Sequence, residues 1–156
     1  MENKFNYFLE TVDNENQNFV KKLNSLFIKK NYQCNIKEAK SGYLVSYTSS
    51  LTKRVIATFV FRKSGIKLRI YPDHIQEYQI ILNEFPDKMK KDIKKASICK
   101  RLLDPNDCNP KCSKGYCFEM DQENYQKCRY MAFMLTLNNE NNNYIMGLIE
   151  KELSYQ

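Results

Sequence analysis

Five of the six cysteines gather in the C-terminal half of the chain, and their thiols carry the most distinctive chemistry in the sequence. They are Cys99, Cys108, Cys112, Cys117 and Cys128, at intervals of 9, 4, 5 and 11 residues, whereas Cys34 stands alone. Four cysteine thiolates hold one Zn²⁺ ion tetrahedrally, with each sulfur about 2.3 Å from the metal. The turn from Cys108 to Cys112 offers one pair of ligands, and Cys99 and Cys128 can close the site from either side. We therefore predict a structural zinc ion.

Three other roles for these thiols stay open on spacing alone. The intervals differ from the paired CxxC pattern of zinc fingers, and a free cysteine is often a small buried hydrophobic residue. Disulfides are the second alternative. The chain begins without the basic and apolar regions of a secretory signal, which favours the cytoplasm, where thiols stay reduced. The third alternative is a redox or nucleophilic cysteine, which requires a thiol of low pKa.

A second candidate site follows from the distribution of charge. The chain carries a net charge of +7, and residues 53–101 alone hold 13 basic and 5 acidic side chains. Alternating residues in this segment predict a β-hairpin with one apolar face. The opposite face gathers Arg62, Lys67, Arg69 and Tyr71. We predict that this face binds a small anionic ligand or a macromolecular partner, and that the protein is not an enzyme.

Two other functions remain as alternatives. A basic face also suits a nucleic-acid-associated protein, because Lys and Arg neutralise phosphates without reading the base sequence. The chain has no helix-turn-helix or RNA-binding signature, however, and the lysines between Lys88 and Lys95 are typical of a solvated helix face. A thiol-based enzyme or redox sensor is the second alternative, since a cysteine could pair with His74, the single histidine. That single histidine excludes a metal centre built on several histidines.

Several runs of the sequence resemble a group of uncharacterised cysteine-rich proteins of clostridia and related gut bacteria. These runs are Ala39–Tyr43, Phe61–Gly65, Arg69–Tyr71, Cys99–Leu102, Cys108–Cys112 and Tyr125–Tyr130. The resemblance covers most of the chain and implies no activity. It implies that Cys99, Cys108, Cys112 and Cys128 are the four zinc ligands, with Cys117 as a substitute ligand. Residues 1–96 are more distantly similar in layout to small α+β domains of the frataxin-like YdhG type and the YjbR type.

Hydrophobic periodicity predicts the elements that position these residues. Helical spacing indicates two helices before residue 31, and alternation indicates three antiparallel strands between residues 43 and 71. Two further helices follow Pro72 and Pro86. From Ser97 to Cys117 no period is present. A hairpin over residues 116–137 and a helix over residues 139–153 complete the chain.

We therefore expect an α+β fold with an antiparallel sheet of about four to six strands. Helices from the N-terminal and C-terminal parts should cover the sheet, and the irregular cysteine-rich segment should be pinned to it. A chain of 156 residues with 42% hydrophobic residues is long enough to bury one core. We expect a single domain over residues 1–156, divided into a core (1–96), a cysteine-rich segment with its hairpin (97–137) and a closing helix (138–156). No apolar run reaches membrane-spanning length, so no membrane partner is expected.

Overall fold

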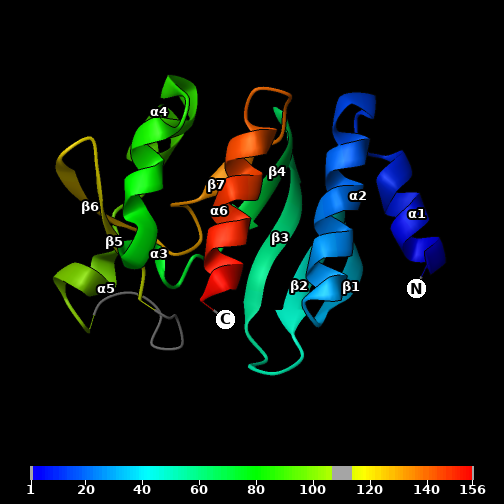
Figure 1. Ribbon diagram of the computed structural model, residues 1–156, viewed down its shortest axis with the longest axis horizontal. Coiled ribbons are helices and arrows are strands. Elements are labelled where there is room, and N and C mark those ends of the chain that lie inside the picture. Colours follow the sequence, from blue (N-terminus) through cyan, green and yellow to red (C-terminus); the bar gives the residue numbers. More distant parts are fainter. Residues whose placement is uncertain (1, 107–113, 156) are drawn as a thin grey trace.

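The computed structural model describes residues 2–106 and 114–155 and has the expected α+β fold (Figure 1). The main sheet and the helices beside it comprise α1 (Glu2–Glu10), α2 (Asn14–Lys29), β1 (Tyr32–Ala39), β2 (Gly42–Ser49), β3 (Val55–Arg62), β4 (Gly65–Ile70), β7 (Met134–Thr136) and α6 (Asn142–Ser154). The remaining elements are α3 (Ile75–Tyr78), the 3-10 helix η1 (Gln79–Glu84), α4 (Asp87–Lys95), α5 (Lys100–Leu103), β5 (Tyr116–Met120) and β6 (Glu123–Lys127). Among the described helices, none is both long and apolar enough to cross a membrane.

The main sheet has five antiparallel strands in the order β1-β2-β3-β4-β7. The predicted three-stranded meander is confirmed as β2, β3 and β4, and it gains a strand on each side. Gly42 follows the tight β1–β2 turn at a φ of +128°, a backbone conformation that favours glycine. Strand β7 joins β4 through Lys67–Thr136 and Arg69–Met134 pairs, which brings the C-terminal part of the chain back to the sheet.

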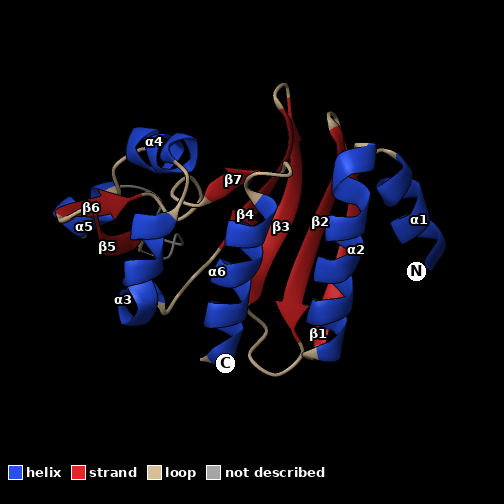
Figure 2. Cartoon of the chain, turned by 45° about the horizontal axis from the view of Figure 1, so that its top comes forward, coloured by secondary structure: helices blue, strands red, loops and turns tan. Residues whose placement is uncertain are grey.

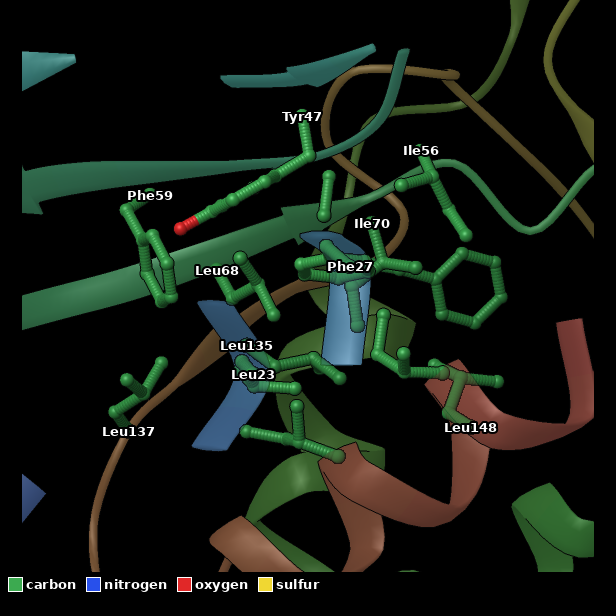
Figure 3. Packing of buried hydrophobic residues seen from close by; sticks show 14 of the residues in the cluster. Leu23, Phe27, Tyr47, Ile56, Phe59, Leu68, Ile70, Leu135, Leu137 and Leu148 are labelled. Carbon is green, nitrogen blue, oxygen red and sulfur yellow. The ribbon is translucent and has the colours of Figure 1, made fainter. Parts of the chain in front are cut away.

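Helices α2 and α6 lie side by side over one face of this sheet (Figures 1 and 2). The helix-covered face takes alternate strand residues, such as Tyr47, Phe59 and Leu68, all of which are fully buried. Leu23 and Leu148 meet them from the two helices (Figure 3). Burying one such side chain contributes about 1.5–3 kcal/mol, so this layer supplies much of the stability. None of the described helices lies over the opposite face of the sheet (Figure 2).

The cysteine-rich part differs from the prediction in its second arm. We expected residues 125–137 to form one long strand of a hairpin, but β6 ends at Lys127 and β7 begins at Met134. Between them the chain turns, with the N–H groups of Met131 and Ala132 donating to the carbonyl oxygen of Cys128. This turn lets β6 pair with β5 while β7 pairs with β4.

Amide side chains of α3 and η1 hydrogen-bond to one edge of strand β5, and β6 pairs with its other edge. Gln76 donates to the carbonyl oxygen of Cys117, and Gln79 and Asn83 accept from the N–H groups of Glu119 and Asp121. The bonded residues of β5 are alternate ones, which is the pattern that a neighbouring strand would satisfy. Helical side chains therefore occupy the free edge of this short hairpin and block further strand pairing there.

Candidate functional sites

The structure describes four of the cysteines, namely Cys34, Cys99, Cys117 and Cys128, and all four are free thiols. Cys108 and Cys112, two of the predicted zinc ligands, lie outside the described residues. Cys34 sits opposite Tyr47 on the helix-covered side of the sheet and is buried. Burial raises the pKa of the Cys34 thiol, although a hydrogen bond with Tyr47 opposes the shift. A buried thiol of raised pKa is a packing group rather than an activated nucleophile.

A short antiparallel bridge places Cys99 and Cys128 near each other. The bridge pairs Ile98 with Lys127. The Cys99 N–H donates to the Gln126 carbonyl oxygen at 3.1 Å, and the Cys128 N–H donates to the Ser97 carbonyl oxygen at 2.7 Å. In this register Cys99 and Cys128 are diagonal neighbours on one face, a relation that typically separates residues by about 7–8 Å. The structure thus brings together two of the four predicted ligands.

The backbone approaches the sulfur of Cys99 closely. Its Sγ accepts a hydrogen bond of 3.2 Å from the N–H of Gly115. A Cβ atom at Gly115 would clash with the Lys127 carbonyl oxygen and with the Cys99 side chain. Glycine is therefore needed for the backbone to approach the sulfur this closely.

Cys117, the predicted substitute ligand, lies one strand further away, because β5 pairs it with Gln126 of β6. Its carbonyl oxygen accepts a hydrogen bond from Gln76. Within residues 2–106 and 114–155, no group of three or more His, Cys, Asp or Glu side chains is placed to hold a metal ion. The described residues therefore provide two thiols of a predicted set whose other members, Cys108 and Cys112, fall outside them.

The predicted basic face is partly assembled on the uncovered side of the sheet. Arg62, Lys67 and Arg69 share this side, because Lys67 pairs with Val60 and Arg69 pairs with Thr58 of β3. Tyr71 follows β4 and is 9% exposed. Its ring packs under the Arg129 guanidinium, which lies 4.9 Å from the ring centroid. The structure therefore groups three of the four predicted residues on the strands, and Tyr71 lies beside Arg69, because both contact Tyr130 and the Tyr71 hydroxyl accepts a hydrogen bond from Arg69.

The uncovered side of the sheet, here called the open face, carries positive charge without acidic partners. The strand residues on this side are Gln33, Asn35, Lys37, Leu44, Ser46, Thr48, Thr58, Val60, Arg62, Lys67, Arg69, Met134 and Thr136, of which Thr58 and Val60, in the central strand, are buried. None of these is acidic, and none of its four cations forms an ion pair with a described residue. Arg69 is oriented by a 2.9 Å hydrogen bond from Nε to the Tyr130 carbonyl oxygen. Lys37 is the member that the sequence interpretation missed, although the spacing of Cys34 and Ile36 indicates its outward position.

Asp73 joins the sheet to the cysteine-rich part through a network of charges. Its Oδ1 accepts from Arg129 Nη1 at 2.7 Å and from the Tyr116 hydroxyl at 3.1 Å, and its Oδ2 lies 3.3 Å from Arg54 Nη1. Burial alone would raise the pKa of this carboxyl group. The hydrogen bond and charge of Arg129, together with Tyr116 and Arg54, lower the pKa of Asp73 below its usual value. Asp73 is therefore ionised, and its carboxylate links the sheet to the cysteine-rich part through contacts with three side chains.

A buried carboxylate holds the single histidine. Glu152 of α6 is fully buried, and its Oε2 lies 2.7 Å from His74 Nδ1. Its Oε1 accepts from the His74 backbone N–H at 3.0 Å and from the Tyr78 hydroxyl at 2.6 Å. Burial, with the hydrogen bond to Glu152, raises the pKa of Tyr78 strongly, so its hydroxyl stays protonated and donates. The sequence suggested His74 as a partner for a cysteine and did not predict this pair.

These two networks border a cavity of about 290 Å³ at the end of the sheet where α6 terminates. The cavity is lined by Tyr32, Thr52, Arg54, Val55, Ile56, Tyr71, Asp73, His74 and Tyr155. The ring of Tyr155 stacks on that of His74, with centroids 5.6 Å apart. A cation, an imidazole and three tyrosines thus meet around one hollow, and their positions in sequence span residues 32 to 155.

No protein-family model, curated protein or solved structure matches this chain. The resemblance to clostridial cysteine-rich proteins and to small α+β domains therefore stays a prediction. The functional interpretation rests on the geometry of the open face, the cysteine pair and the cavity.

Proposed function

We propose that this protein binds a phosphate-bearing polyanion, of the kind that nucleic acids present, across the open face of its sheet. The observation that carries this proposal is the set of four cations, Lys37, Arg62, Lys67 and Arg69, on a face without acidic residues. Unpaired cations on an uncovered surface attract a polyanion and displace its condensed counterions. The hydroxyl of Ser46, which hydrogen-bonds to the buried Thr58 at 3.0 Å, lies among them.

The shape of the open face favours a macromolecular partner over a small anionic ligand, the two occupants that the sequence left open. Small-molecule sites are concave, with volumes of about 300–1,000 Å³. Arg62, Lys67 and Arg69 line none of five cavities formed by the described residues, whereas Lys37 borders one of them beside Lys4 and Tyr7. An extended sheet surface with charges on several strands suits contact with successive phosphates instead.

The tyrosines of β2 favour backbone contacts over base stacking, because their rings are on the helix-covered side of the sheet. Tyr43 packs there against Phe8, with ring centroids 6.2 Å apart. Tyr47 is fully buried there as well. Binding should therefore depend on charge and show little base preference, because phosphate contacts carry no sequence information.

Matched double variants test the proposal. Fluorescence anisotropy with labelled single-stranded and duplex DNA should show that Arg62→Ala with Lys67→Ala lowers affinity about 10-fold or more at low salt. The control is Lys21→Ala with Lys22→Ala, which removes the same charge from exposed positions of α2 on the helix layer. Equal losses in both variants, or no binding by the unmodified protein, would contradict the proposal.

We also propose that one zinc ion stabilises the cysteine-rich part, held by Cys99, Cys128, Cys108 and Cys112. The N–H bond to Cys99 Sγ and the shared face of Cys99 and Cys128 support this assignment. When bound, the ion would cross-link the chain and leave no position for catalysis. Elemental analysis should find one zinc per chain, and Cys128→Ser should lose it while Cys34→Ser keeps it. A metal-free protein, or equal loss in both variants, would remove zinc from the account.

A further inference from the structure

We propose that the cavity beside Arg54 and His74 is a second ligand site, which binds a small oxyanion such as a carboxylate or a phosphate. The cavity lies at the α6 end of the sheet and shares none of the four cations of the open face. This inference goes beyond polyanion binding and does not depend on it. Its volume of about 290 Å³ is at the lower end of the usual range for small-molecule sites, about 300–1,000 Å³.

Arg54 supplies the first anion-binding group. Its Nη1 lies 3.3 Å from Asp73 Oδ2, and its side chain is 73% exposed. Asp73 is already neutralised from its other side by Arg129, at 2.7 Å. Two guanidinium groups therefore share one carboxylate, which leaves Arg54 with charge and with N–H donors for a ligand.

His74 supplies the second group. A carboxylate only accepts hydrogen bonds, so the 2.7 Å contact with Glu152 places the hydrogen on Nδ1. The backbone N–H of His74 donates to the other oxygen of the same carboxylate, which fixes the residue in place. No described residue bonds to Nε2 of the ring, and the side chain is 41% exposed at the cavity wall. Nε2 is therefore the ring atom of His74 that can meet a ligand in the cavity.

The charges beside the cavity favour an anionic ligand, because two guanidinium groups, Arg54 and Arg129, face the single carboxylate of Asp73. The lining also contains hydroxyl groups. They belong to Tyr32, Thr52, Tyr71 and Tyr155. Burial raises the pKa of both Tyr32 and Tyr71, so their hydroxyls remain neutral. Aromatic and aliphatic walls are left for the apolar part of a ligand.

Titration of the full chain with inorganic phosphate, and separately with acetate, tests this site. Two-dimensional amide NMR should show saturable shifts at residues 52–56 and 73–74 at concentrations up to about 20 mM for at least one of the two anions. Arg54→Ala should weaken that binding about 10-fold or more, because it removes a charge-assisted donor. Loss of the same shifts in His74→Gln, in a variant whose other amide signals are unchanged, would support the second contact.

Arg62→Ala is the matched control, because it removes an arginine from the other end of β3 and lies outside the cavity. It should weaken DNA binding and leave the phosphate shifts unchanged, whereas Arg54→Ala should do the reverse. Absence of saturable shifts with both anions would overturn the inference. Equal loss of the shifts in Arg54→Ala and Arg62→Ala would also overturn it, and neither result would affect the DNA measurement.

Discussion

The main sheet with its covering helices and the cysteine-rich part of the chain share one apolar core but differ in how much they depend on polar contacts. In the first region (residues 2–71 and 134–155), large apolar side chains from α2, α6 and the strands fill one layer (Figure 3). In the second region (residues 97–106 and 114–133), Tyr116, Phe118, Met120 and Phe133 join the same apolar cluster, and individual polar contacts attach the short hairpin as well. Apolar burial is spread over many residues, whereas each polar contact depends on one partner.

The second region should therefore lose its structure more easily than the first when a single contact is removed. Lys127 illustrates it, because its buried Nζ donates to the carbonyl oxygens of Lys94 and Ala96 and so binds the last turn of α4. Its own β6 strand is tied to residues 97–99 through one isolated bridge. A region assembled in this way needs an additional constraint, and the proposed zinc ion supplies one.

Zinc removal should have the largest effect on stability. It should unfold the second region and leave the first region folded. Structural zinc sites contribute apparent binding free energies on the order of 10 kcal/mol, so chelation should unfold residues 114–133. Amide hydrogen exchange should accelerate there, while amides of β2, β3 and β4 keep their protection. Uniform acceleration across both regions, or none in either, would contradict the distinction.

Glu152→Ala should give the next largest effect, inside the first region. It leaves the His74 N–H, the His74 ring and the Tyr78 hydroxyl without their shared buried acceptor. We expect the free energy of unfolding to fall by about 3–5 kcal/mol in urea denaturation. Glu150→Ala is the control, since Glu150 is exposed on the same helix and its loss should cost less than about 0.5 kcal/mol. Similar losses in both variants would show that Glu152 has no special role.

Asp73→Asn should weaken the joint between the regions by roughly 2–3 kcal/mol at neutral pH, because charge-assisted bonds to Arg129 and Arg54 are lost. The pKa of Asp73 is lowered in the folded protein, so its contribution is fully present above its ordinary value of 3.8. The contribution disappears as the pH falls through the folded-state pKa. Urea denaturation of both proteins between neutral and acidic pH should show converging stabilities. A pH-independent difference would contradict the assigned role.

The open face should give the smallest effect on stability. Arg62 and Lys67 form no ion pair with a described residue, so replacing both by alanine should change the free energy of unfolding by less than about 0.5 kcal/mol. Thermal unfolding measures this directly. A large loss of stability would mean that these residues support the sheet, and their effect on binding would then need a different explanation.

The sequence predicted the first region better than the second, for a physical reason. Apolar alternation in β2, β3 and β4 and helical spacing in α2 and α6 are local signals, and the corresponding elements are confirmed. The separation of β6 from β7 was missed, because it depends on which strand each one pairs with.

The polar sites were also missed where their partners are far apart in the sequence. Arg129 reaches Asp73 across 56 residues, and Glu152 reaches His74 across 78. No spacing rule connects such partners, so the cavity between them was not predicted. Arg62, Lys67 and Arg69 were grouped correctly because strand alternation alone places them on one face.

The salt dependence of DNA binding tests the central claim most directly. With four phosphate contacts, the logarithm of the association constant should fall with the logarithm of salt concentration at a slope of about −3.6 for duplex DNA, and less steeply for a single strand. Replacing Arg62 and Lys67 by alanine should make this slope shallower by about 2. A slope near zero, or no binding at about 50 mM salt, would contradict the claim that the open face binds a polyanion.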